Sequence, residues 1–260
     1  MKRIGFIGMG NMAGALARGF IASGKVAPGD IFAFAPHQDK LERNAQAIGF
    51  TPCKSVLDLL DCSDVAILAC KPHQIAGVLA EIKEPLRGKP LLSIAAGWQH
   101  HDFVATLGEG FHIQCLMPNV AASVAEGVFL FEDDSSLTAD ELAFAKELFG
   151  TLGLVQVLPT ALMKIGTAIT GCGPAFMDMI MEAYADAAVK WGIPRDVAYT
   201  LVAQTMLGSA KLQLDTKCHP GALKDAVCSP GGTTIVGVAS LEASGLRGAC
   251  ISSIDAIMAS

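Results

Sequence analysis

The sequence is poor in charge and has no cluster of lysines or arginines. Its 260 residues carry 19 basic and 25 acidic side chains, which gives a formal net charge of -6. Proteins that bind nucleic acids present a basic stripe to the phosphate backbone, so we expect no nucleic-acid partner. Hydrophobic residues make up 52% of the chain and charged residues 17%. This balance excludes extensive disorder and provides for one large core or two smaller ones.

The chain also lacks the roughly 18 uninterrupted apolar residues that a membrane-spanning helix needs, although its mean hydropathy is high at +0.45. Lys2 and Arg3 precede an apolar stretch, as in a secretory signal, but Gly5, Gly8 and Gly10 interrupt that stretch. We therefore expect no membrane span, no signal peptide and a cytoplasmic location.

No two cysteines have the C-x-x-C spacing of zinc ribbons or thioredoxin-like redox sites. The eight cysteines are scattered along the chain at Cys53, Cys62, Cys70, Cys115, Cys172, Cys218, Cys228 and Cys250. We expect them to be small buried residues of a reduced cytosolic protein. The spacing of His100, His101, His112 and Cys115 matches no compact ligand set, so we expect no metal.

Short apolar segments alternate with helical patterns through the first part of the chain. We expect strands at residues 3–7, 31–34, 65–70, 91–95 and 111–116, and helices at residues 12–23, 39–47, 74–83 and 101–107. Strands that are apolar on both faces and separated by helices are typical of a parallel sheet covered on both sides. The pattern predicts an α/β fold.

The pattern changes after a further pair of strands, at 127–131 and 154–158, which flank a helix with a Thr138–Glu141 capping box. Beyond Pro159 only helical patterns remain, with Pro174 and Pro194 as first-turn residues. We expect a Rossmann-type dinucleotide-binding domain at 1–159 and an all-helical domain at 160–260. Because helices at 175–189 and 197–212 are apolar over much of their circumference, we also expect an interface between chains.

The clearest chemical motif lies between the first predicted strand and the first predicted helix. It fits the G-x-G-x-x-G/A fingerprint of dinucleotide-binding domains and reads Gly8-Met9-Gly10-Asn11-Met12-Ala13. Gly8 permits a tight turn, Gly10 lets the backbone approach a pyrophosphate, and Ala13 allows close packing of helix on strand. The amides at the helix start then hold the anion.

The end of the second predicted strand indicates which dinucleotide is bound. An NAD-specific site usually has an acidic residue there for the ribose hydroxyls, whereas this chain has Ala35, Pro36 and His37. Ala35, His37 and Lys40 leave room and positive charge for a 2′-phosphate, which favours NADPH. Two alternatives remain: His37 and Lys40 could be a solvated helix start, and a shift of two residues would make Asp39 the usual acid.

Other strand ends should border the nicotinamide half of the cofactor, because open α/β sheets bind ligands at the carboxyl ends of their strands. The candidates are Ala69, Cys70, Lys71, Pro72, Ala95 and Gly97. Lys71 could instead be an ordinary surface lysine. Asn119 could bond the carboxamide of the cofactor or cap the turn that follows.

Two glycine-rich segments of the helical part precede predicted helices. The first is 170–176, where glycines and Pro174 would bring the backbone close to a ligand or another helix. The second offers exposed amides and hydroxyls for a carboxylate and contains Ser229, Gly231, Gly232, Thr233 and Thr234. A plain interhelical turn is the alternative for both.

These segments together, in their order along the chain, resemble the pyrroline-5-carboxylate reductase family. The resemblance is carried by residues 8–12, 71–72, 117–119, 170–176 and 229–234, and it spans nearly the whole chain. The last segment, continued by Gly237, Leu241 and Glu242, is the most specific. The glycine fingerprint alone is shared with many dehydrogenases.

The resemblance implies reduction of 1-pyrroline-5-carboxylate to L-proline by NAD(P)H, the last step of proline biosynthesis. It implies an all-α dimerisation domain, whose helices interleave in a homodimer that is sometimes assembled into a larger ring. The implied cofactor contacts are at 8–12, 35–37, 69–72 and 95–97, and the substrate carboxylate would lie at Ser229 and 231–234. Among the catalytic candidates, Ser229 and Thr234, we expect Thr234 to offer the hydrogen bond to the imine nitrogen.

Two segments depart from the family pattern. Residues 170–176 replace Ser-Gly-Ser-Gly-Pro-Ala-Tyr but keep its glycines and proline, which should preserve the local backbone. Ala35, Pro36 and His37 stand where an Asn or Ser with a nearby Arg is frequent, so NADH is possible as well as NADPH. The alternative functions are another imine or 2-hydroxyacid reductase of the same two-domain design and a noncatalytic NADP-binding regulator. Lys164 is available as the catalytic lysine of a 2-hydroxyacid reductase, but the segment 229–234 fits that activity badly.

Overall fold

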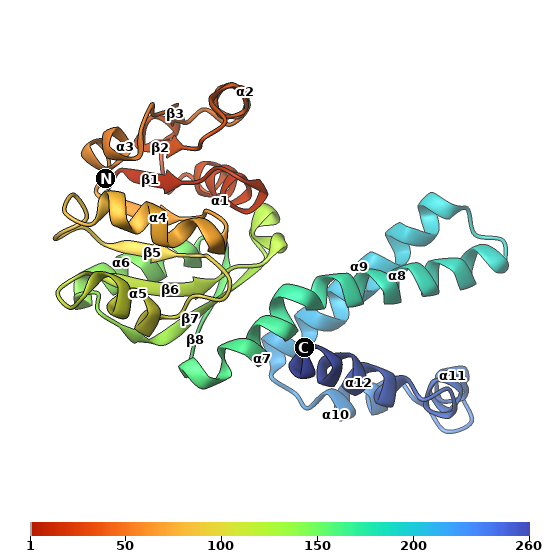
Figure 1. Ribbon diagram of the computed structural model, residues 1–260. Helices are drawn as coiled ribbons and strands as arrows, with labels where there is room; N and C mark the ends of the chain where they lie inside the picture. Colours follow the sequence, from red (N-terminus) through yellow and green to blue (C-terminus); the bar gives the residue numbers. More distant parts are fainter. Residues whose placement is uncertain (1) are drawn as a thin grey trace. The chain divides into compact units, whose positions relative to one another are not determined.

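The structure, a computed structural model, describes residues 2–260 and forms two compact units (Figure 1). The first ends at Gly171 and contains the sheet, and the second, Cys172–Ser260, is helical. The predicted α/β fold with an all-helical second part is confirmed. The first unit extends beyond residue 159, because the segment after β8 packs on β7. A methyl group added at Gly166 would lie 2.6 Å from Leu158 and 2.8 Å from Leu130.

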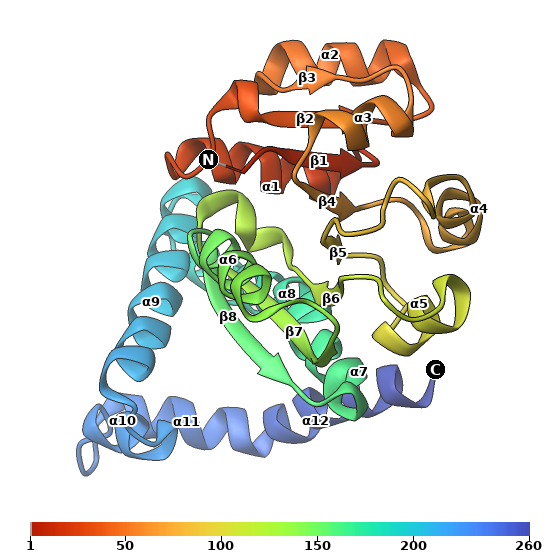
Figure 2. The ribbon, with the colours of Figure 1, turned by 90° about the vertical axis from the view of Figure 1, so that its left-hand side faces the viewer.

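An eight-stranded sheet forms the centre of the first unit (Figure 2). Its order is β3-β2-β1-β4-β5-β6-β7-β8, and the first six positions follow the order of doubly wound dinucleotide-binding folds. The strands are β1 (Ile4–Ile7), β2 (Ile31–Phe34), β3 (Thr51–Pro52), β4 (Val65–Leu68), β5 (Leu91–Ser93), β6 (Ile113–Met117), β7 (Gly127–Ser135) and β8 (Gly153–Leu158).

The predicted parallel arrangement is confirmed for β1, β2, β4, β5 and β6, and the antiparallel pairing involves β7, for which no direction was predicted. β7 is antiparallel to β6, and β8 is parallel to β7. The chain between Met117 and Gly127 is too short for the helical crossover that a parallel pair requires, which takes a dozen or more residues. A complete crossover through α6 joins β7 to β8, so that pair is parallel.

The helices of the first unit lie close to the predicted positions. They are α1 (Asn11–Ala22), α2 (Gln38–Ile48), α3 (Val56–Cys62), α4 (Pro72–Ile82), α5 (His100–Leu107), α6 (Ala139–Gly150) and α7 (Met163–Thr167), with 3-10 turns at Pro28–Asp30, Val120–Val124 and Thr160–Leu162. The predicted capping box of α6 is present, since Thr138 and Glu141 bond each other's backbone amides. β3 and α3 were not predicted, because a strand of two residues and a helix of seven are too short to show a hydrophobic period.

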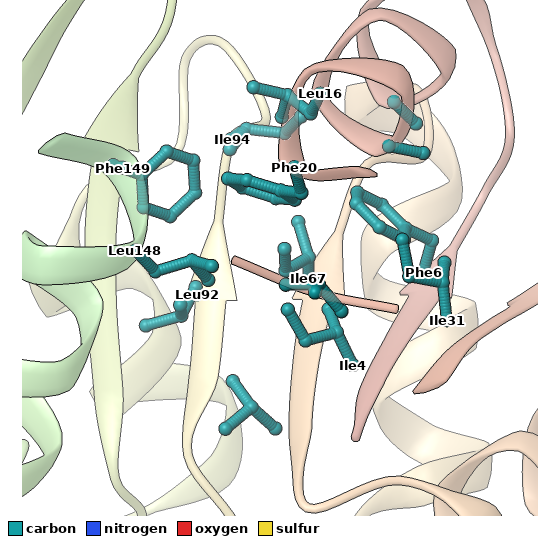
Figure 3. Close-up of a cluster of buried hydrophobic side chains, with 14 of the residues drawn as sticks. Ile4, Phe6, Leu16, Phe20, Ile31, Ile67, Leu92, Ile94, Leu148 and Phe149 are labelled. Atoms are coloured by element: carbon teal, nitrogen blue, oxygen red, sulfur yellow. The ribbon is translucent and has the colours of Figure 1, made fainter. Parts of the chain in front are cut away.

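Helices cover both faces of the sheet and produce two hydrophobic clusters. Figure 3 shows the first, where Phe20 of α1 and Phe149 of α6 lie over Ile4, Ile67 and other side chains of the strands. The Phe20 and Phe149 ring centroids are 5.5 Å apart in an edge-to-face arrangement. The second cluster packs α3, α4 and α5 on the opposite face. Neighbouring strand residues enter different clusters, which explains why the strands are apolar throughout.

The second unit consists of helices that bury little of their own surface. They are α8 (Gly173–Lys190), α9 (Arg195–Thr216), α10 (Pro220–Ala226), α11 (Thr233–Ala243) and α12 (Leu246–Ala259). Of the hydrophobic residues in Cys172–Ser260, only Ala185 and Ala198 are buried, whereas Trp191 is 85% and Leu214 is 66% exposed. This unit therefore has no hydrophobic core of its own.

The cysteines are not uniformly buried, although all eight are free thiols. Cys53 and Cys115 are buried in the first unit, but Cys218 and Cys250 are exposed. The expectation of buried cysteines is wrong for these two, because they belong to the helical unit that buries so little. In the described part of the chain, no helix combines the length and apolar character needed to cross a membrane.

Candidate functional site

The turn between β1 and α1 is tight and admits only glycine at its first position. Gly8 has φ +98°, and its amide donates to the carbonyl of Phe34 at 2.8 Å. A Cβ added there would lie 2.8 Å from the carbonyl oxygen of Ala69 at the end of β4. Both the backbone angle and the close approach to β4 therefore require glycine.

Gly10 forms the N-terminal cap of α1 and faces open space. Its φ is −83°, and a Cβ added there would meet no atom within 4 Å. The cap has no side-chain hydrogen bond, and the first turn of α1 contains no acidic residue. The amides of this first turn have no partner within the helix and carry its positive dipole end, so they can bind an anion.

A pocket of about 460 Å³ lies beside this turn. Nine of the predicted cofactor residues line it, namely Gly8, Met9, Gly10, Ala35, Pro36, His37, Ala69, Cys70 and Lys71. It also includes Lys40, His73 and Gln74, of which only Lys40 was considered from the sequence. No aspartate or glutamate occurs among the described residues of its lining, which contains two lysines and two histidines. The pocket therefore suits a ligand with negative charge.

The β2 end of this pocket is where an acidic residue would contact the ribose hydroxyls of NAD. His37 is the N-terminal cap residue of α2, and Lys40 lines the pocket from the first turn of that helix. Asp39 is exposed and lies outside the lining. The side chain of Gln38 donates to the carbonyl of Ala35 at 2.9 Å and holds this corner. This arrangement fits the prediction that His37 and Lys40 face a 2′-phosphate better than the alternative in which Asp39 binds the ribose hydroxyls.

The β4 end of the pocket is formed by Cys70 and Lys71. Cys70 is half-buried, and this burial raises the pKa of its thiol against a smaller lowering by a backbone hydrogen bond. The side chain is therefore a neutral thiol at physiological pH and adds no charge to the pocket. The amide of Lys71 donates to Oε1 of Gln74 at 3.1 Å, which fixes the start of α4.

Six predicted cofactor residues are not part of the pocket lining. They are Asn11, Met12, Pro72, Ala95, Gly97 and Asn119. Asn11, Met12 and Pro72 begin helices next to lining residues, and Ala95 and Gly97 follow β5. Asn119 is buried, and it accepts from the amide of Val128 and donates to the carbonyl of Thr170, both at 3.0 Å. These bonds favour a structural role for Asn119 over a contact with the carboxamide.

The segment 170–176 leads into a helix with Pro174 in its first turn, as predicted, but the residues before that helix are themselves helical and form no plain interhelical turn. A π-helical turn, Ala168–Cys172, leads directly into α8, and Pro174 lies in the first turn of α8. Pro174 has no amide to donate to Thr170, four residues earlier, so the regular helical ladder cannot continue there. The widened turn accommodates the proline, and the Thr170 carbonyl accepts its bond from Asn119 instead.

The segment 229–234 forms a tight turn directly before α11. The amide of Gly232 donates to the carbonyl of Ser229 at 3.0 Å, and Gly231 has φ +69°. With Pro230 before it, this is the arrangement of a type II turn. A methyl group added at Gly232 would collide with Oγ of Ser229. Gly232 caps α11 without a side-chain bond, so the first-turn amides and the exposed Thr233 and Thr234 can meet a carboxylate.

Two family models match the chain. Residues 3–97 match the family described as NADP oxidoreductase coenzyme F420-dependent, and residues 160–260 match the one described as pyrroline-5-carboxylate reductase dimerisation. Similar curated proteins include the pyrroline-5-carboxylate reductases of Treponema pallidum (strain Nichols) and Escherichia coli (strain K12). Each is 39% identical to this chain over 99% of its length, and the alignments cover 99% and 96% of those proteins.

Solved structures of such reductases have the same fold over nearly the whole chain. The pyrroline-5-carboxylate reductase of Coxiella burnetii superimposes with a TM-score of 0.89 at 32% identity, covering 98% of this chain and 96% of that one. The Plasmodium falciparum pyrroline carboxylate reductase with NADP bound has a TM-score of 0.88 at 29% identity, with 98% and 95% covered.

The two glycines of the turn allow a matched pair of substitutions. Gly10→Ala should leave stability nearly unchanged, since φ −83° suits alanine and the space is open. Its methyl group would occupy that space and should weaken binding of NADPH about tenfold or more, or about 1.4 kcal/mol. Gly8→Ala should instead destabilise the fold by about 1–3 kcal/mol from the backbone angle alone. Calorimetric titration with NADPH and urea unfolding measure the two effects, and equal NADPH affinity in Gly10→Ala and the wild type would contradict the assignment.

Proposed function

Because this chain belongs to the pyrroline-5-carboxylate reductase family, we propose that its glycine-turn pocket holds the nicotinamide cofactor and that Ser229–Thr234 hold the substrate carboxylate. The family's reaction is the reduction of 1-pyrroline-5-carboxylate to L-proline at the expense of NAD(P)H, and this chain catalyses it. The observation that carries the assignment of the cofactor site is the pocket beside Gly10, whose lining among the described residues includes no aspartate or glutamate.

The pocket supports NADPH as the preferred cofactor. Gly8, Met9 and Gly10 with the start of α1 would hold the pyrophosphate, and His37 and Lys40 would meet the 2′-phosphate. The Plasmodium falciparum relative was solved with NADP bound. When bound, the cofactor supplies the hydride, and the protein contributes placement and hydrogen bonds. NADH lacks the 2′-phosphate and would gain nothing from Lys40.

The segment 229–234 would orient the substrate. The amides at the start of α11 and the hydroxyl of Ser229 would bind the carboxylate of the cyclic imine. Thr234 would offer its hydroxyl to the imine nitrogen, which accepts a hydride best when protonated. A threonine hydroxyl is too weak an acid to supply that proton efficiently, so its role is hydrogen bonding and orientation.

The second unit matches the family's dimerisation model, and we propose that it forms a homodimer through its helices. The support is physical: helices with only Ala185 and Ala198 buried among their hydrophobic residues need a further surface to pack against. Assembly into a larger ring and a cytoplasmic location stay predictions of the sequence resemblance.

Initial rates with purified protein test the reaction and the cofactor preference together. We expect oxidation of NADPH with 1-pyrroline-5-carboxylate, coupled to formation of proline, and slower oxidation of NADH. Lys40→Ala should raise KM for NADPH about tenfold, because a bond to a charged group is lost, and should leave KM for NADH nearly unchanged. NADH is thus the internal control. If NADPH bound without turnover, a different substrate or the noncatalytic alternative would be favoured.

Thr234→Ala should lower kcat at least about tenfold, because a hydrogen bond to the reacting nitrogen is lost. The dissociation constant of NADPH should hardly change. Thr234→Ser keeps the hydroxyl and should retain most of the turnover. Steady-state kinetics with NADPH titrations measure both quantities, and an alanine variant as fast as the serine variant would remove Thr234 from the proposed mechanism.

Leu214→Asp tests the dimer. This side chain of α9 is 66% exposed in the single chain, and a carboxylate buried without a partner would oppose association. Light scattering coupled to size exclusion should show a dimer for the wild type and a shift toward monomer for the variant. Asp215→Asn, on the next residue of the same helix, should stay dimeric, and dissociation of both variants would argue against a specific contact at Leu214.

A further inference from the structure

A buried carboxylate of the first unit has no place in the reaction described above. Glu132 of β7 is 2% exposed. Its Oε2 accepts from the backbone amide of His100 at 2.9 Å, and its Oε1 accepts from the hydroxyl of Thr160 at 2.7 Å. The partners of this charge are neutral donors, and burying a carboxylate is costly unless such bonds are well formed. Glu132 therefore depends on both His100 and Thr160 being in place.

An irregularity of the sheet directs this carboxylate and its two neighbours to these partners. Between the pairs Gln114–Ser135 and Leu116–Phe131, β6 has one residue and β7 has three, Glu132, Asp133 and Asp134. Irregularities of this kind re-aim side chains. Figure 2 shows α5 beside β7 in this part of the unit.

Each carboxylate of the triplet contacts one or both of the same two residues. Oδ1 of Asp133 accepts from the amide of Thr160 at 2.9 Å, and Oδ2 of Asp134 lies 3.1 Å from Nδ1 of His100. The side chain of Gln99 also donates to the carbonyl of Thr160 at 3.4 Å. His100 and Thr160 are thereby held on a common support.

His100 and Thr160 each begin the helical segment that follows a strand of the sheet. His100 begins α5 and directly follows the loop 94–99, which contains Ala95 and Gly97 and lies at the carboxyl end of β5. Thr160 begins the 3-10 turn after β8 and is the first residue of the segment that matches the dimerisation model. The other end of the loop is fixed by β5, so holding His100 restricts the whole loop.

We propose that Glu132, Asp133 and Asp134 position the loop 94–99 for hydride transfer by holding its end at His100 and bracing it against Thr160. These are positioning residues, because they act through the loop and touch no reacting atom. The proposal rests on the proposed function and on the sequence-based prediction that Ala95 and Gly97 border the nicotinamide half of the cofactor. The sequence signal is the run of three acids directly after the predicted strand 127–131.

Glu132→Gln is the first test, because it keeps the shape but removes the negative charge and replaces one of the two acceptor oxygens with an amide group, so the side chain can no longer accept from both His100 and Thr160. We expect kcat to fall about tenfold or more, since small displacements at a reacting centre are costly. KM for NADPH should change less than about threefold, because the adenosine half binds in the separate pocket. Glu147→Gln, an exposed glutamate of α6, is the matched control and should have wild-type kinetics.

Hydrogen exchange gives a readout that does not depend on turnover. Amides of residues 94–101 should exchange faster in Glu132→Gln than in the wild type or in Glu147→Gln, all without cofactor. Unchanged exchange and unchanged kcat in Glu132→Gln would overturn the positioning role. A wild-type protein without turnover would overturn the proposed function and this role with it, so the two failures are distinguishable.

Two further pairs keep the test informative if Glu132→Gln folds poorly. Thr160→Val removes the hydroxyl and should lower kcat, while Thr160→Ser keeps the hydroxyl and should restore it.

His100→Pro deletes the amide donor at the first helical position, where proline is tolerated, and Gln99 before it already has the extended backbone that proline requires. His100→Ala retains the amide, so a lower kcat in His100→Pro reports the bond to Glu132, and equal values would contradict it.

Discussion

The close approach of the β1–α1 turn to the end of β4 determines the geometry of the first unit. Gly8 lies where a side chain would meet the carbonyl of Ala69 at 2.8 Å. With this contact, α1 begins shortly after β1, and the unpartnered amides of its first turn lie at the carboxyl edge of the sheet. The same placement lays Phe20 of α1 on the face of the sheet beside Phe149. The position of the amides that can bind an anion and the packing of the hydrophobic cluster therefore both follow from this tight turn.

Much of the first unit could be predicted because its determinants are local. The strand Ile31–Phe34 and the α6 capping box are present as predicted, since a buried strand and a capped helix each have a short pattern of their own. The direction of β7 was also encoded, in the short link between Met117 and Gly127, but it requires counting residues between strands. The short elements β3 and α3 offer no such pattern, because their packing against the sheet stabilises them.

Other features depend on contacts between distant residues and have no local pattern. The role of Asn119 follows from the missing amide of Pro174, which leaves the Thr170 carbonyl to be satisfied from elsewhere. The positions of His73 and Gln74 in the pocket follow from the packing of α4 beside β4. In the same way, the acids of β7 look like solvated residues in the sequence, yet Glu132 is buried. The partners of a buried polar group are known only from the fold.

The apolar composition of the second unit predicts an interface between chains but not its geometry. An apolar side chain that stays exposed forgoes about 1.5–3 kcal/mol of stabilisation relative to burial, and Leu214, Val236 and Ile251 are all more than 60% exposed in the single chain. These exposed apolar side chains therefore do not stabilise the helical unit as an isolated chain. The sequence therefore indicates that another surface must cover these helices. It cannot give the geometry, because the apolar side chains of α9 are spread around the helix among polar ones and no single face is distinguished. For such helices the arrangement is fixed by the shape of the partner surface.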